Sequence, residues 1–102
     1  MASWSDLRAD LIRISGTENV YYQPPPNVRM KFPCIRFKLE QVDVKYASNS
    51  VYMFKNKYQF TYISNVVSDD LVREFISKLR YCTFDRSYVS DNLYHYVFTV
   101  FY

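Results

Sequence analysis

The segment that decides the fold is Cys34-Ile35-Arg36-Phe37-Lys38-Leu39-Glu40, in which apolar and charged residues alternate. Successive side chains of a β-strand point to opposite faces, so this pattern predicts a strand with one buried face and one solvated face. From Val42 onward the apolar residues change phase. This slip predicts a bulge or a sharp twist near Glu40 and Gln41.

The next strand is predicted from Val51 to Ser64. One of its faces carries the aromatic residues Phe54, Tyr58, Phe60 and Tyr62, and the other carries the polar residues Lys55, Lys57, Gln59 and Thr61. The turn-like residues 47–50 precede it. We therefore expect a long hairpin from Pro33 to Ser64.

Two amphipathic helices flank this hairpin. The first is predicted from Trp4 to Ser15, because its apolar residues recur at helical spacing and Gly16 can adopt the left-handed conformation that ends a helix. The second is predicted from Asp69 to Arg80, with Ser68 as its N-cap. Its apolar stripe, which we expect to pack on the sheet, comprises Leu71, Val72, Phe75, Ile76 and Leu79.

Two further strands are predicted, from Cys82 to Tyr88 and from Leu93 to Tyr102, with a turn through residues 90–92. The last strand is apolar on both faces and should lie centrally or at an interface. The sequence thus predicts one α+β domain over residues 1–102. We expect about four strands, mainly antiparallel, in its sheet.

Residues 17–33 show no periodicity, and their consecutive prolines favour extended backbone. The segment is nevertheless too apolar to remain in water. We expect an ordered extended arm that lies either on its own sheet or on another subunit. Twenty of the 102 residues are aromatic, more than one small core needs, which favours contact with a neighbouring chain.

Positive charge is concentrated between Arg29 and Lys57, where seven basic residues stand against two acidic ones. One interpretation is a solvated strand face that discourages edge pairing between molecules. The other is a basic surface that meets nucleic acid or an acidic protein.

The sequence offers no catalytic constellation. Its single histidine, His95, lies between two tyrosines and is expected to be packed or hydrogen-bonded. Cys34 and Cys82 lack the spacing of a zinc site and are expected to be reduced and buried. We therefore expect no enzyme, no metal site and no cofactor. A small nucleic-acid or protein-binding module is the alternative function kept open, although the aromatic strands lack the usual RNA-binding pattern.

The amino terminus shows no signal-peptide pattern, and no apolar run is long enough to span a bilayer. These features predict synthesis in the cytoplasm and no membrane partner.

Several clusters, taken in order, resemble the tail terminator or tail completion proteins of long-tailed bacteriophages. The clusters are residues 20–25, 28–35, 46–49, 58–63, 82–88 and 91–93. One departure is visible at Ser64-Asn65-Val66-Val67, which stands where the family pattern has an acidic, proline-containing turn. The resemblance covers most of the chain.

The resemblance implies an α+β subunit of a ring, commonly a hexamer, at the head-proximal end of the tail. Such a ring stops growth of the tail tube and offers a docking surface to the head, and its partners are the tube protein and a head completion protein. A passage for the genome DNA through the ring is a further expectation from the resemblance. The residues that we predict to make interface contacts are Tyr21, Tyr22, Pro24, Arg29, Lys55, Lys57, Asp85 and Arg86.

Overall fold

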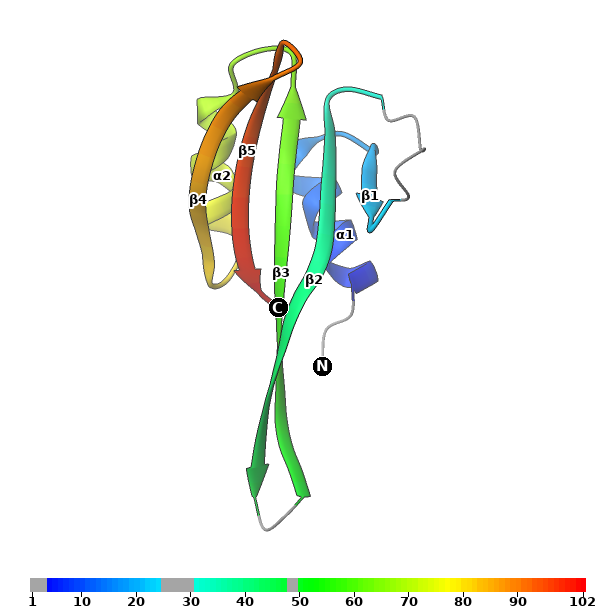
Figure 1. The fold of residues 1–102 in the computed structure, drawn as a ribbon, viewed down its shortest axis with the longest axis vertical. Helices are drawn as coiled ribbons and strands as arrows, with labels where there is room; N and C mark the ends of the chain where they lie inside the picture. The colour runs from blue at the N-terminus through cyan, green and yellow to red at the C-terminus, as the bar shows by residue number, and fades with distance from the viewer. Residues whose placement is uncertain (1–3, 25–30, 48–49) are drawn as a thin grey trace.

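The computed structural model describes residues 4–24, 31–47 and 50–102, and of residues 43, 45–47 and 50–55 it describes the backbone alone. Two helices and five strands follow one another along the chain (Figure 1). They are α1 (Trp4–Ser15), β1 (Val20–Tyr22), β2 (Cys34–Ala47), β3 (Ser50–Ser64), α2 (Asp69–Lys78), β4 (Cys82–Ser90) and β5 (Leu93–Phe101). The protein therefore has the predicted α+β class.

The sheet has five strands in the order β1-β2-β3-β5-β4, and β1 pairs with β2 in parallel. The prediction of about four mainly antiparallel strands missed β1, which lies within the predicted arm. Val20 of β1 pairs with Ile35 and is buried. A three-residue strand is too short to show a period, and its pairing with β2 is set by contacts that are distant in sequence. This part of the arm lies on its own sheet.

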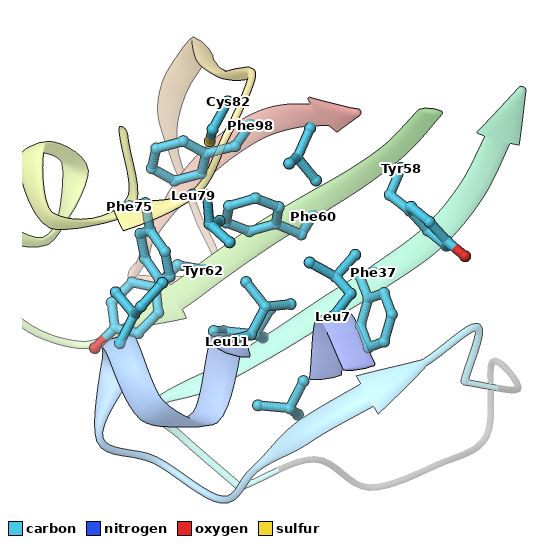
Figure 2. Close-up of a cluster of buried hydrophobic side chains, with 14 of the residues drawn as sticks. Leu7, Leu11, Phe37, Tyr58, Phe60, Tyr62, Phe75, Leu79, Cys82 and Phe98 are labelled. Atoms are coloured by element: carbon cyan, nitrogen blue, oxygen red, sulfur yellow. The ribbon is translucent and has the colours of Figure 1, made fainter. Parts of the chain in front are cut away.

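Both helices cover the same face of the sheet, and the core lies between them and the strands. Phe60 lies at the centre of this core, with its ring stacked on Phe98 at 4.7 Å and set edge-on to Phe75 at 5.1 Å. Figure 2 shows Leu7 and Leu11 from α1, and Phe75 from α2, directed toward these strand residues. The helix-covered face is therefore an apolar and largely aromatic layer.

The first helix begins and ends at the predicted residues. Gly16 follows it with φ at 76°, and its N–H donates to the carbonyl of Ile12 at 2.9 Å. The left-handed conformation that ends the helix is the one that glycine adopts without strain.

The second helix ends at Lys78, two residues before the predicted Arg80. Phe75 and Leu79 are buried as expected, Leu71 is half-buried, and Ile76 is 43% exposed, so its expected burial is wrong. One residue along a helix is a rotation of about 100°, which turns Ile76 away from the face that Phe75 buries.

The sequence suggested that the side chain of Ser68 caps α2, but this side chain makes no capping hydrogen bond. Its hydroxyl instead donates to the carbonyl of Val66 at 3.2 Å. The start of the helix is held by Tyr96 of β5, whose hydroxyl accepts from the Ser68 N–H at 3.0 Å and donates to Asp69 at 3.1 Å. A buried tyrosine therefore links the helix terminus to the sheet.

The predicted long hairpin is present as β2 and β3, and the predicted phase slip appears as a register shift between Leu39 and Gln41. Beyond this shift, residues 42–47 pair with residues 50–56 and leave the body of the sheet (Figure 1). We call this two-stranded extension the distal ribbon. β5 pairs with β3 from Lys57 to Ser64 and does not follow it into the distal ribbon.

β5 is central, as its two apolar faces predicted, since it pairs with both β3 and β4. It is joined to β4 by Asp91 and Asn92, which have φ values of 52° and 63°. Two consecutive left-handed residues form the tight turn that matches the twist of a hairpin, and Asp and Asn tolerate this conformation well. The predicted turn is thus confirmed.

Candidate interaction surfaces

The face of the sheet opposite the helices is open, and Arg36, Lys38 and Arg86 are among its described basic residues. One row of paired residues crosses all five strands: Tyr21, Arg36, Thr61, Val97 and Arg86. Paired residues point to the same face of a sheet. The predicted interface residues Tyr21 and Arg86 therefore lie at opposite ends of one row, which the sequence alone did not bring together.

A hollow of about 540 Å³ lies on this open face. Its lining includes the buried side chains of Ile63 and Val97. Polar and charged residues around it are Gln23, Arg36, Lys38, Gln59, Thr61, Arg86, Tyr88 and His95. No carboxylate belongs to this lining. The hollow is thus apolar beneath and cationic around its edge.

The three cations at the hollow have no ion-pair partner among the described side chains. Within the residues whose side chains are described, Arg36, Lys38 and Arg86 form no ion pair, whereas Lys57 lies 3.8 Å from Glu40. The guanidinium of Arg86 lies 6.0 Å from the centroid of the Tyr88 ring. This arrangement favours an anionic group as the partner of the open face.

His95 is packed and hydrogen-bonded, as predicted. Its ring stacks on Tyr88 at 4.6 Å with an interplanar angle of 10°, and Nδ1 lies 3.1 Å from the carbonyl oxygen of Leu93. Tyr88 covers one face of the imidazole, and His95 forms part of the wall of the hollow.

The arm residues lie on two different sides of the sheet, the helix-covered side and the open face. Tyr22 stacks on Trp4 at 4.7 Å and lies 4.9 Å from the ring of Phe37, so it joins α1 to the sheet. Tyr21 is half-buried on the open face, and Pro24 lines the hollow. The structure separates two neighbouring tyrosines that the sequence had treated alike.

Two predicted interface residues lie outside what the structure describes. Arg29 is outside the described residues, and of Lys55 the backbone alone is described, as part of β3. Lys57 lies next to the distal ribbon and, through its contact with Glu40, is less available to a partner than its sequence position suggested.

Asp85 and Arg86, predicted as interface residues and consecutive in β4, form no ion pair with each other. Asp85 is the extra residue of a bulge in β4, and its carboxylate accepts a hydrogen bond from the hydroxyl of Thr99 at 2.6 Å. Arg86 instead lies beside Tyr88. Because of the bulge, the consecutive residues Asp85 and Arg86 contact different neighbours.

The outer edge of the sheet at β4 is a surface that the sequence analysis missed. Every residue of β4 after Cys82 is exposed, including Phe84, Tyr88 and Val89 at 39, 44 and 65%. The sequence of β4 mixes apolar and polar residues without clear alternation. Whether β4 lies at the edge of the sheet depends on which strands become its neighbours.

The two cysteines are free and buried, as predicted. Burial raises the pKa of Cys34 to about 11 and that of Cys82 to about 12. A thiol with so high a pKa is almost fully protonated at neutral pH and is a poor nucleophile. Across the described part of the chain, no group of His, Cys, Asp and Glu has the arrangement of a metal site.

Comparison of the chain with models of protein families, with curated proteins and with solved structures gives no match. None of the described helices is long and apolar enough to cross a membrane.

Proposed function

We propose that this protein is a tail terminator of a long-tailed bacteriophage. In this role it assembles with further copies into a ring, commonly of six, at the head-proximal end of the tail in the virion. The ring ends growth of the tail tube and provides the surface that joins the tail to the head. The subunit acts by surface complementarity, without a catalytic step or a cofactor.

The observation that carries this proposal is the distal ribbon. A two-stranded hairpin is at best marginally stable in water when nothing packs on it. Within the described residues, its strands pair with each other and with no further strand. Its sequence is rich in apolar residues, among them Val42, Val44, Val51 and Phe54. A ribbon of this kind gains stability from a neighbouring subunit or from the tube.

The basic open face supports the same role. Arg36, Lys38 and Arg86 line a hollow and form no ion pair with the described side chains. In a ring, this face meets an acidic surface of the tube or the head completion protein, or the genome as it passes. The clusters that resemble tail terminators occur in the order expected for that family. The location that we propose is therefore the virion.

Deletion of the gene from the phage that encodes it tests the proposal. We expect tails of uncontrolled length and heads without joined tails, and we expect wild-type protein supplied from a plasmid to restore normal particles. Electron microscopy measures both effects. Tails of normal length joined to heads in the deletion strain would show that the proposed function is wrong.

A second candidate is a nucleic-acid-binding module, favoured by the cationic hollow with the exposed Tyr88 beside it. Aromatic rings and arginines on a sheet can stack bases while lysines contact phosphates. Fluorescence anisotropy with a short single-stranded DNA tests this candidate. Binding that falls steeply with salt and is lost when Arg36→Glu and Arg86→Glu are combined supports it. No binding at low salt excludes it.

A further inference from the structure

β4 presents an exposed outer edge. It is the last strand of the sheet on its side, and within the described residues no strand lies beyond it. Natural edges are commonly protected by lysine or proline, and Cys82–Ser90 contains neither. Its protective features are the bulge at Asp85 and the charges of Asp85 and Arg86, which lie at the start of the exposed edge. Residues 86–90, which follow the bulge, form a regular strand that can pair with another.

The tight turn at Asp91 and Asn92 fixes which backbone groups point outward. In a two-residue hairpin the flanking pair, here Ser90 and Leu93, exchanges both hydrogen bonds, and every second pair repeats this arrangement. The backbone N–H and C=O groups of Tyr88 and Arg86 therefore also point toward β5. Ser87 and Val89 direct their N–H and C=O groups away from the sheet, where no described strand receives them.

The distal ribbon has a matching unpaired edge on β2. β1 pairs with β2 over residues 35–37, so no described strand flanks residues 42–47 on that side. Six residues of strand span about 20 Å and the five residues 86–90 span about 17 Å, so the two edges match in length. β3 and β5 separate β2 from β4, and the ribbon leads away from the sheet (Figure 1). Within one chain these edges do not meet.

We propose that residues 86–90 of β4 bind the β2 edge of the distal ribbon of a second copy, which extends the sheet across the boundary between subunits. Each copy then has one edge that donates a strand and a different edge that accepts one. Such a head-to-tail contact repeats around a ring and closes when the rotation allows it. This inference rests on the proposed assembly and identifies the surfaces that would carry it.

Pairs of variants, each with one cysteine added to the native two, test the contact. Ser87→Cys is mixed under oxidising conditions with a variant that carries one cysteine at position 42, 43, 44, 45 or 46. We expect cross-linked dimers at alternate ribbon positions, since side chains on one face of a strand recur every second residue. The wild type provides the control, because Cys34 and Cys82 are buried. A uniform or absent yield along the ribbon would overturn the inference.

Cross-linking of Ser87→Cys to itself distinguishes the main competing arrangement. Two β4 edges that pair about a twofold axis would give this product in the absence of a ribbon cysteine. That result would show that the ribbon is the wrong occupant, because a twofold β4 pair uses the edge on both copies and cannot continue around a ring.

A proline substitution tests the outward N–H directly. Ser87→Pro removes one outward N–H and leaves the ladder to β5 intact, so we expect a folded protein whose self-association is at least about tenfold weaker. Ser87→Thr keeps the N–H and should associate like the wild type. Light scattering measures association, and the denaturant midpoint verifies folding. Equal association of both variants would contradict strand addition.

The outcomes separate this inference from the proposed function. A wild-type protein that remains monomeric at millimolar concentration excludes pairing between free copies, and the tail-length experiment still decides whether the protein is a terminator. Uncontrolled tail length in the deletion strain, combined with normal tails when Ser87→Pro is supplied, would retain the function and reject this interface.

Discussion

The helix-covered face and the open face of the sheet are built from alternate residues of the same strands, yet they differ in chemistry. Phe37, Phe60 and Phe98 lie fully or almost fully buried under the helices, whereas Arg36 and Arg86, on the opposite side, are exposed. The first face supplies the hydrophobic free energy of folding, and the second presents charge. This division means that stability and recognition are separable by mutation.

The largest expected effect is on the helix-covered face. Phe75→Ala should lower the free energy of unfolding by about 3–5 kcal/mol, since it leaves a cavity beside Phe60 and Phe98. Ile76→Ala, one residue away and 43% exposed, is the matched control and should cost less than about 1 kcal/mol. Urea unfolding measures both, and equal losses would contradict the packing of α2.

The two arm tyrosines should divide along the same line. Tyr22→Ala removes the stack on Trp4 and the contact with Phe37, and should cost about 2 kcal/mol. Tyr21→Ala, on the open face, should cost less than about 1 kcal/mol. If the open face meets a partner, Tyr21→Ala should nevertheless reduce infectious particles. A larger stability loss for Tyr21→Ala would show that the division is wrong.

Alkaline pH should weaken the fold through groups buried in the protonated form. Burial raises the pKa of Cys34 to about 11 from 9.0, and that of Cys82 to about 12. Below pH 9 both thiols are protonated in both states, so the contribution is complete. Above pH 9 the unfolded chain loses protons first, and stability falls as pH rises toward the folded pKa values.

The urea midpoint measured from neutral pH to about pH 11 tests this sign. A double variant, Cys34→Ala with Cys82→Ala, should show a shallower decline. A decline remains in it, because burial also raises the pKa of Tyr58 and Tyr96 above 10.0. An identical decline in the variant and the wild type would exclude the thiols as its cause.

The smallest effect on stability is expected on the open face. Arg36→Glu and Arg86→Glu should each change the free energy of unfolding by no more than about 0.5 kcal/mol, since these exposed cations form no ion pair with the described side chains. Arg36→Gln and Arg86→Gln are controls that remove charge without reversing it. A loss above about 2 kcal/mol would mean that the open face supports the fold.

Local patterns were sufficient to predict most elements. The alternation from Cys34 to Glu40 predicted β2, the change of phase after it predicted the bulge, and Gly16 predicted the end of α1. Each of these depends on residues that are close in sequence. The same holds for the turn at Asp91 and Asn92.

Contacts between distant residues account for what was missed. β1 is a strand because it pairs with Ile35 and Phe37 of β2. The start of α2 is held by Tyr96, which lies 28 residues after Ser68. Among the candidate site residues, Tyr21 and Arg86 were identified, but their shared row follows from the strand order. The exposed edge of β4 depends on that order too, because a local pattern does not show which strand lies outermost.

The insertion of β5 between β3 and β4 has a consequence for the time course of folding. β4 reaches the rest of the sheet through β5, so the two are expected to form a local hairpin around Asn92 that then docks on β3. The docking step joins residues at least thirty positions apart, and such nonlocal pairing slows folding. Asn92→Ala should therefore slow refolding more than it accelerates unfolding, in stopped-flow measurements. The opposite partition would place this turn among the last parts of the molecule to form.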